Sequence, residues 1–175
     1  MAIGTQVIFQ ASSDGWLDLG RGRRVRCVFG RSGVIAADDK REGDGKTPLG
    51  EWPLRHVLYR ADHGGAPQTA LETRAIMPDE GWCDAPDDPC YNRPVRLPYP
   101  ASAEKLWRDD RLYDLVVVLG HNDDPVEAGM GSAIFLHLAA PDYRATEGCV
   151  AVRRADMETL LRSAKPGDAL RIVKA

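Results

Sequence analysis

Short apolar runs and alternating polar and apolar residues recur along most of this chain, a pattern typical of β-strands. Residues 24–29 alternate with period two, so that Val25, Cys27 and Phe29 share one face of a predicted strand. Other apolar runs predict strands at 6–10, 56–59, 71–77, 132–138, 150–152 and 169–173. We expect the first of these to lie at a sheet edge. The run 113–119 is apolar on both faces, which predicts a strand at the centre of a sheet.

Two stretches have the pattern of short helices, 102–110 and 157–163. In the second, Met157, Leu160 and Leu161 form an apolar stripe, and Asp156 is the predicted N-cap. We therefore predict a mainly β protein in which β-sheets pack on each other with one or two short helices. The length of 175 residues suits a single domain, residues 1–175.

Composition and charge exclude several classes of protein. Hydrophobic residues make up 43% and charged residues 28%, as in ordinary soluble domains. The net charge of −3 gives no reason to expect a nucleic-acid partner. No apolar segment reaches the roughly 18 residues that span a bilayer. Residues 1–12 lack the basic start and apolar middle of a secretion signal, so we expect a cytoplasmic protein, or a periplasmic or cell-wall one if a leader was removed.

The chain has four cysteines, Cys27, Cys83, Cys90 and Cys149. A disulfide between Cys83 and Cys90 is compatible with their spacing, although a domain of this size does not need one. Their spacing does not match common zinc sites, in which two to four residues separate paired cysteines. We therefore expect no metal site.

The stretch with the most chemical information contains His137 at the end of a predicted strand, a polar loop, and Cys149. The two residues are 12 positions apart, so the loop can fold back and bring imidazole and thiol together. A nucleophilic cysteine needs a nearby base and backbone N–H groups for the oxyanion. Gly148 allows a sharp turn and close approach of a substrate. The alternative is an inert, buried cysteine beside a core histidine.

Two segments resemble the L,D-transpeptidase (YkuD-like) catalytic-domain family, in particular a short proteobacterial branch. The first family motif is a strand ending in His, a loop, then Ser/Thr-His-Gly-Cys and an aliphatic residue, and its matches here are His137, Thr146, Gly148, Cys149 and Val150. The second is Lys-Thr-Pro-x-Gly before a strand, matched by Lys46, Thr47, Pro48 and Gly50. Glu147 replaces the usual second His, Ala151 replaces the usual Arg or Asn, and the loop is shorter.

The resemblance implies cleavage of the peptide bond after the L-centre of diaminopimelate in a peptidoglycan stem tetrapeptide. Cys149 would attack the carbonyl, His137 would transfer the proton, and N–H groups near Gly148 and Cys149 would hold the oxyanion. Transfer of the thioester to an acceptor amine gives a transpeptidase, the function we favour. Transfer to water gives a cytoplasmic L,D-carboxypeptidase of peptidoglycan recycling, and a non-enzymatic peptidoglycan-binding module is the third alternative. No metal or organic cofactor is implied, and we expect a monomer.

The resemblance also suggests substrate-binding residues. A proline-rich loop at 82–94 resembles a loop of the short branch, which suggests four cleft residues: Trp82, Tyr91, Asn92 and Arg93. The alternative is a proline-stiffened surface loop. Thr146 and Glu147 precede the nucleophile. A carboxylate at Glu147 raises the pKa of a neighbouring thiol, so we consider two roles for it, orientation of His137 and recognition of an acceptor ammonium. For His121, in a predicted turn, exposure to solvent is favoured over a place in the site.

Overall fold

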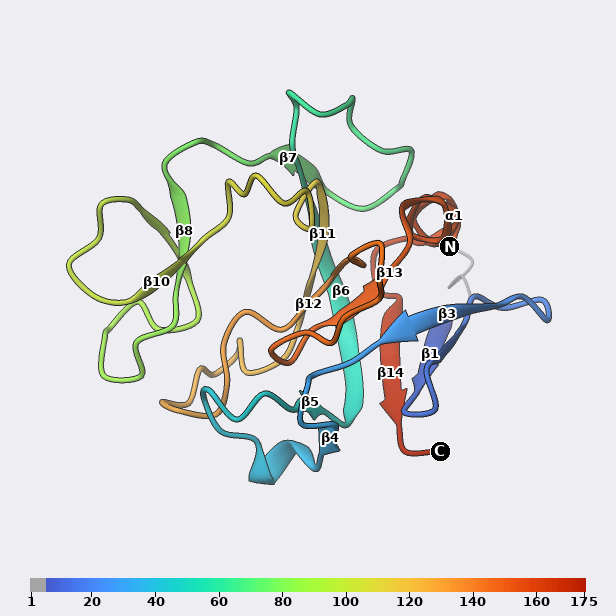
Figure 1. Ribbon diagram of the computed structural model, residues 1–175, viewed down its shortest axis with the longest axis horizontal. Coiled ribbons are helices and arrows are strands. Elements are labelled where there is room, and N and C mark those ends of the chain that lie inside the picture. The colour runs from blue at the N-terminus through green and yellow to red at the C-terminus, as the bar shows by residue number, and fades with distance from the viewer. Residues whose placement is uncertain (1–5) are drawn as a thin grey trace, which may run out of the picture.

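The computed structural model describes residues 6–175, and these form one large sheet, one small sheet and one short strand pair (Figure 1). The large sheet contains β1 (Ile8–Ser12), β2 (Trp16–Asp18), β3 (Arg24–Val28), β6 (Gly50–Tyr59), β7 (Thr73–Ala75), β11 (Leu115–Leu119), β12 (Phe135–Leu138), β13 (Val150–Val152) and β14 (Ala169–Val173). The small sheet contains β8 (Glu80–Cys83), β9 (Pro94–Arg96) and β10 (Ala103–Lys105), and β4 (Val34–Ile35) pairs with β5 (Thr47–Pro48). Of the N-terminal segment that we interpreted as lacking a secretion signal, residues 1–5 lie outside the described part.

The large sheet closes on itself. Its strands are ordered β11-β12-β13-β3-β2-β1-β14-β6-β7, and β11 also pairs with β6. The ten-residue β6 makes closure possible, because its first part pairs with β14 and its second part with β11 and β7. Closure hides strand edges and surrounds an apolar core. The predicted mainly β fold is confirmed: the large sheet packs on itself around this core, and the small sheet is separate from it.

The two predictions about strand position had different outcomes. All five residues of β11 are buried, and the strand lies between β12 and β6, so its central place is confirmed. Strand β1 lies between β14 and β2 rather than at an edge, so that prediction was wrong. Its parallel pairing with the C-terminal strand is a long-range contact, which local hydrophobicity does not report.

The helices also differ in part from the prediction. Helix α1 (Arg154–Ser163) buries Met157, Leu160 and Leu161 as expected, but Asp156 lies in its first turn and is not the N-cap. The predicted helix at 102–110 was wrong, because residues 103–105 form β10, which pairs with β8, and bends follow. A 3₁₀ turn, η1 (Ala37–Asp39), was not predicted. Within residues 6–175, no helix has the length and apolar character required to cross a bilayer.

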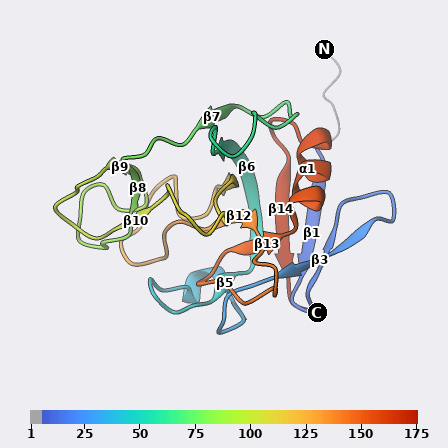
Figure 2. The same cartoon turned by 45° about the horizontal axis from the view of Figure 1, so that its top comes forward.

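Strand β12 separates two apolar clusters, and this places His137. Leu136 and Leu138 face the cluster inside the closed sheet, and residues 135 and 137 point to the opposite side. There Phe135 packs edge-on against Trp82 of β8, with ring centroids 5.1 Å apart, and Cys149 belongs to the same cluster. The small sheet therefore covers the outer face of β12, at the opposite end of the molecule from α1 (Figure 2).

Removal of the Asp168 carboxylate should destabilise this fold. Asp168 is fully buried, with Oδ1 accepting the Val7 N–H at 2.8 Å and Oδ2 accepting the Lys165 N–H at 3.0 Å. Asp168→Ala removes both acceptors, so we expect a loss of about 2–3 kcal/mol in the free energy of unfolding, measured by urea denaturation. Asp18→Ala, which removes an acceptor for Gly20 N–H in an exposed turn, is the control. Equal losses in the two variants would contradict this prediction.

Candidate active site

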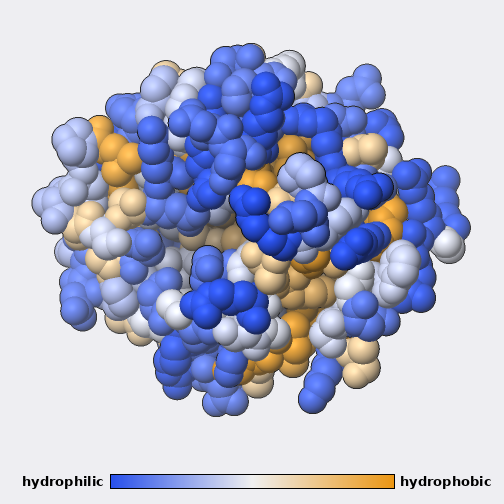
Figure 3. Space-filling view, viewed as in Figure 1, coloured by the Kyte–Doolittle hydropathy of each residue, from blue (hydrophilic) through white to orange (hydrophobic). Residues whose placement is uncertain are grey.

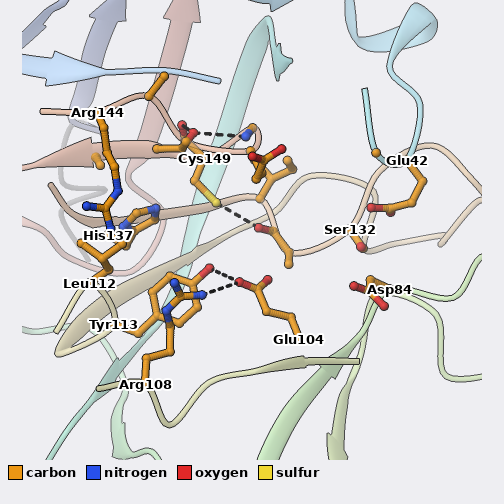
Figure 4. Close-up of a pocket in the computed structure, with 18 of the residues that line it drawn as sticks. Glu42, Asp84, Glu104, Arg108, Leu112, Tyr113, Ser132, His137, Arg144 and Cys149 are labelled. Carbon is orange, nitrogen blue, oxygen red and sulfur yellow. Dashed lines mark hydrogen bonds and ion pairs between the residues drawn. The ribbon is translucent and has the colours of Figure 1, made fainter. Parts of the chain in front are cut away.

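A cleft of about 480 Å³ opens between the small sheet and strands β12 and β13. Cys149 and His137 both line it, so the structure brings the predicted nucleophile and the predicted base into one cavity (Figure 4). The face of the molecule shown in Figure 3 is mostly hydrophilic and is hollowed near its middle.

Two motifs far apart in the sequence meet at the backbone of Cys149. The Thr146 hydroxyl donates to the Cys149 carbonyl oxygen at 2.7 Å. The hydroxyl of Thr47, 102 residues away in the sequence, lies 3.5 Å from the same oxygen. Thr47 Oγ1 also accepts the Gly30 N–H at 2.8 Å. The predicted substrate-binding residue Thr146 therefore holds the nucleophile's backbone in place.

Gly148 occupies a position that only glycine accepts without strain. Its φ is +145°, and a Cβ atom here would lie 3.0 Å from the Lys46 carbonyl oxygen. Its N–H donates to Thr146 Oγ1 at 3.1 Å. This N–H, which we expected to be available for an oxyanion, is thus engaged in the turn itself.

The Cys149 thiol is protonated at neutral pH. It donates to the Ala133 carbonyl at 3.1 Å, and the Phe135 N–H points at Sγ from 3.4 Å. Burial, and secondly the negative charge of Glu104, raise the pKa of Cys149 to about 12. A thiolate is therefore not preformed, and a thiol in this state acts as a nucleophile only when a base removes its proton.

His137 is a neutral, oriented base in this environment. Its Nδ1 lies 2.9 Å from the Leu138 carbonyl oxygen, which only accepts, so Nδ1 carries the proton and Nε2 the lone pair. Burial lowers the pKa of His137 to about 4, although the carbonyls of Leu138 and Leu112 act in the opposite direction. The Tyr113 ring packs edge-on against the imidazole, with centroids 5.1 Å apart. At neutral pH the imidazole is therefore in the form that a general base requires.

Sequence reasoning missed a polar cluster, Glu104, Arg108 and Tyr113, that lines the cleft beside His137. Tyr113 Oη donates to Glu104 Oε1 at 2.5 Å, and Arg108 lies 3.5 Å from the same oxygen. Burial raises the pKa of Glu104. The only signal in the sequence was that Glu104 and Arg108 are four residues apart. The same spacing is found in ordinary ion pairs on the surface of a helix, so it did not point to a cleft.

Two of the residues predicted for the cleft hold the backbone beside Cys149. Trp82 Nε1 donates to Asn92 Oδ1 at 2.8 Å, and the same oxygen accepts the Ala133 N–H at 3.0 Å. Ala133 has a positive φ of 52°, uncommon for a residue with a side chain. The Ala133 carbonyl accepts the hydrogen bond of the Cys149 thiol. Trp82 and Asn92 therefore hold the acceptor of that hydrogen bond in place.

None of the four residues predicted from the loop at 82–94, Trp82 and Asn92 included, is among those that line the cleft. Tyr91 is buried and donates at 2.5 Å to Glu42, which does line it. Arg93 donates to a backbone carbonyl on the surface at 2.6 Å. His121 is buried with its ring 4.8 Å from that of Trp52, so the expectation of a solvent-exposed turn histidine was wrong. Packing of the turn against β6 removes it from water.

Glu147 lies at the mouth of the cleft, with 79% of its side chain exposed. Its carboxylate pairs with Arg31 Nε at 2.8 Å. Exposed pairs of this kind contribute about 0–1 kcal/mol, so the carboxylate remains accessible to a ligand. This placement disfavours orientation of the buried His137.

Lys40 also lines the cleft without having been predicted. The same is true of Arg144, Glu42, Asp84 and Ser132. Arg144 lies near His137 in Figure 4, and the other three lie at the opposite end. Ala151, where the family pattern has Arg or Asn, also lines the cleft. Arg144 therefore brings a guanidinium to the cleft from the loop that precedes the nucleophile.

The remaining cysteines are placed differently from Cys149. All four cysteines are free thiols, so Cys83 and Cys90 do not form a disulfide. Burial raises the pKa of Cys27 to about 12 and also raises that of Cys83. In the part of the chain that the structure describes, no three His, Cys, Asp or Glu side chains gather as a metal site. Cys149 is the cysteine that lines the cleft.

The raised pKa of Cys149 predicts how its alkylation depends on pH. The thiolate fraction grows about tenfold per pH unit below the pKa of about 12, so the rate with iodoacetamide should rise steadily from roughly pH 6 to 9. Intact-protein mass spectrometry measures the rate, and Cys149→Ala gives the background from other thiols. A constant rate across this range would indicate a preformed thiolate–imidazolium pair instead.

Comparison with known proteins agrees with this geometry. The family model of the L,D-transpeptidase catalytic domain (YkuD) matches residues 8–173, from the first residue of β1 to the last of β14. A search of curated proteins found no relative that matches the chain. The match includes both motifs and the whole cleft, and it confirms the resemblance seen in the sequence. The chain therefore belongs to the L,D-transpeptidase catalytic-domain family, whose members act on peptidoglycan.

Proposed function

We propose that this protein is a cysteine-dependent L,D-transpeptidase that acts on peptidoglycan stem peptides. One observation carries the proposal: the Cys149 thiol and a neutral His137, oriented through Nδ1 by the Leu138 carbonyl, line one cleft of an L,D-transpeptidase catalytic domain. A module that only binds peptidoglycan does not need this pair. The donor is a stem tetrapeptide, and the acceptor is an amine of a second stem peptide.

In the acylation step, Cys149 Sγ attacks the donor carbonyl while His137 Nε2 takes the thiol proton. With a thiol pKa of about 12 and an imidazole pKa of about 4, a resting ion pair is unfavourable, so proton transfer accompanies attack. The backbone N–H of Cys149 stabilises the oxyanion, since that of Gly148 is engaged by Thr146. The C–N bond then breaks, His137 protonates the leaving amine, and a thioester remains.

In the second step an amine attacks the thioester. His137 removes a proton from the amine, the C–S bond breaks, and the thiol of Cys149 is restored. The acceptor enters between loop 139–146 and Glu147, at the mouth of the cleft. If water attacks instead, the product is a tripeptide and the enzyme is an L,D-carboxypeptidase.

Substitution of the two reacting side chains tests the proposal. Cys149→Ala should abolish release of the D-amino acid from disaccharide tetrapeptide and also covalent addition of a carbapenem. His137→Ala should lower the release rate by ~10²–10⁴-fold with little change in melting temperature, because it removes the general base. His121→Ala, a buried histidine outside the cleft, is the control and should have a smaller effect. Labelling that persists in Cys149→Ala, or an unfolded His137→Ala, would contradict these roles.

Glu147 should influence what takes the acyl group. A carboxylate at the cleft mouth attracts the ammonium of an acceptor peptide, so Glu147→Gln should lower the dimer-to-tripeptide ratio more than it lowers thioester formation. Mass spectrometry of the products at matched acylation measures the ratio. Arg31→Gln, which releases Glu147 from its ion pair, should not lower it. An unchanged ratio in Glu147→Gln excludes an acceptor role, and tripeptide alone from the wild type establishes the carboxypeptidase.

A further inference from the structure

The face of the large sheet that carries His137 continues from the cleft to the hairpin of β2 and β3. His137 pairs with Ala151 of β13, and Ala151 pairs with Val28 of β3, so these three side chains lie on one face. His137 and Ala151 both line the cleft. Arg26 follows on the same face of β3, two residues from Val28. The cleft wall and the outer side of the hairpin therefore belong to one surface.

The hairpin presents arginines and a tryptophan on this surface. Leu17 and Val25 are buried, and the residues that alternate with them, Trp16, Arg24 and Arg26, are exposed. Trp16 lies opposite Arg26 in the strand pair and is 44% exposed, and the Arg24 guanidinium lies 5.5 Å from the centroid of its ring. Tryptophan and arginine are the residues most enriched where proteins bind partners.

Positive charge is concentrated in this hairpin. Residues 19–26 contain four arginines and no acid, and because the whole chain has a net charge of −3, the remainder carries −7. The four are Arg21, Arg23, Arg24 and Arg26. Two of them approach carboxylates, Arg23 at 3.6 Å from Asp156 and Arg24 at 3.8 Å from Asp14. Ion pairs this long and this exposed hold a guanidinium only weakly, so the hairpin can exchange them for contacts with a partner.

Tyr143 arranges two further cations between the hairpin and the cleft. The guanidinium of Arg26 lies 4.2 Å and that of Arg153 5.1 Å from the centroid of the Tyr143 ring. Neither guanidinium forms an ion pair with a carboxylate of residues 6–175. Tyr143 directly precedes Arg144, which lines the cleft. The positive surface therefore begins beside the cleft and extends onto the hairpin.

The chemistry of this surface fits a polymer that carries carboxylates. The hairpin uses arginine and no lysine, and the planar guanidinium matches a carboxylate with two hydrogen bonds. Peptidoglycan carries many stem peptides, each with a carboxylate at its free end, so a strand with one stem peptide in the cleft brings others close to it. The turn of the hairpin, which extends at the right of Figure 1, has the sequence Gly20-Arg-Gly-Arg23 and offers no apolar side chain for insertion into a bilayer.

We propose that Trp16, Arg24, Arg26 and Arg153 form a docking surface for the acidic peptidoglycan polymer outside the cleft. The inference rests on the proposed function, because the stem peptide in the cleft fixes where the rest of the strand lies. The arginines contact carboxylates of stem peptides other than the one that reacts. The surface therefore favours polymeric peptidoglycan over a single soluble disaccharide peptide.

Co-sedimentation of Cys149→Ala with intact peptidoglycan sacculi tests this surface, because this variant does not turn over the polymer. The two probes are sacculi with free carboxylates and the same sacculi after amidation of those carboxylates. Adding Arg24→Gln and Arg26→Gln should weaken binding to the free-carboxylate sacculi about 5- to 30-fold, as for two exposed charged contacts. Adding Arg96→Gln and Arg162→Gln, which removes the same charge from exposed positions on β9 and α1, should weaken it about twofold or less. Amidated sacculi should bind all three proteins equally weakly.

Turnover separates the docking surface from the proposed function. With Cys149 intact, Arg24→Gln with Arg26→Gln should release amino acid from disaccharide tetrapeptide at the wild-type rate and from sacculi more slowly. If the hairpin and control variants bind sacculi equally, the surface is wrong, although release from the tetrapeptide shows that the function stands. Tighter, hairpin-dependent binding to vesicles of phosphatidylglycerol would make the partner a membrane and overturn the proposal. If the wild type releases no amino acid while hairpin-dependent binding to sacculi persists, the enzyme function fails and the docking surface remains supported.

Discussion

The hydrogen bonds around the Cys149 carbonyl are the constraint on which the active site depends. Thr146 donates to this oxygen, Thr47 lies beside it, and Gly148 packs against the Lys46 carbonyl. The loop is also tied to the end of β3 by the bridge between Gly30 and Thr146. Since these groups come from three segments of the chain, the contacts among those segments, rather than the loop alone, determine where the thiol lies.

Burial has opposite effects on the two reacting groups, and both effects favour neutral forms. It raises the pKa of the Cys149 thiol to about 12 and lowers that of the His137 imidazole to about 4. The resting site therefore holds a thiol bonded to a backbone carbonyl and an imidazole oriented by another. A thiol in this state reacts slowly with general electrophiles, because the thiolate is the nucleophile. Under the proposed function, reactivity then depends on a substrate that brings its carbonyl to the sulfur.

The residues around this neutral pair differ in what they do. Trp82 and Asn92 hold the Ala133 peptide behind the sulfur, whereas Arg144 and Asp84 present opposite charges from the two ends of the cleft. The first group acts through packing and backbone hydrogen bonds and is insensitive to the substrate. The second group lines the cleft itself, where its charges face whatever peptide binds there.

The sequence alone determined those features that depend on local pattern. Alternation and continuous apolar runs predicted β3, β11 and β12, and helical spacing predicted the buried stripe of α1. Two separate motifs, found in the expected order along the chain, predicted the family. Such signals are local because a strand or a helix buries its face with period 2 or 3.6 whatever lies opposite. His137 and Cys149 also lie in one local motif, 12 positions apart, so the sequence identified this pair without any knowledge of long-range contacts.

Tertiary structure alone decided the features that depend on contacts between distant segments. The pairing of β10 with β8 overrode the helical pattern at 102–110 and brought Glu104 to the cleft, because propensity is weak relative to packing. Parallel pairing with β14 placed β1 inside the sheet, and packing on Trp52 buried His121. The charged ends of the cleft arise in the same way: Arg144 and Asp84 come from separate loops, and only the folded chain brings them to one cavity.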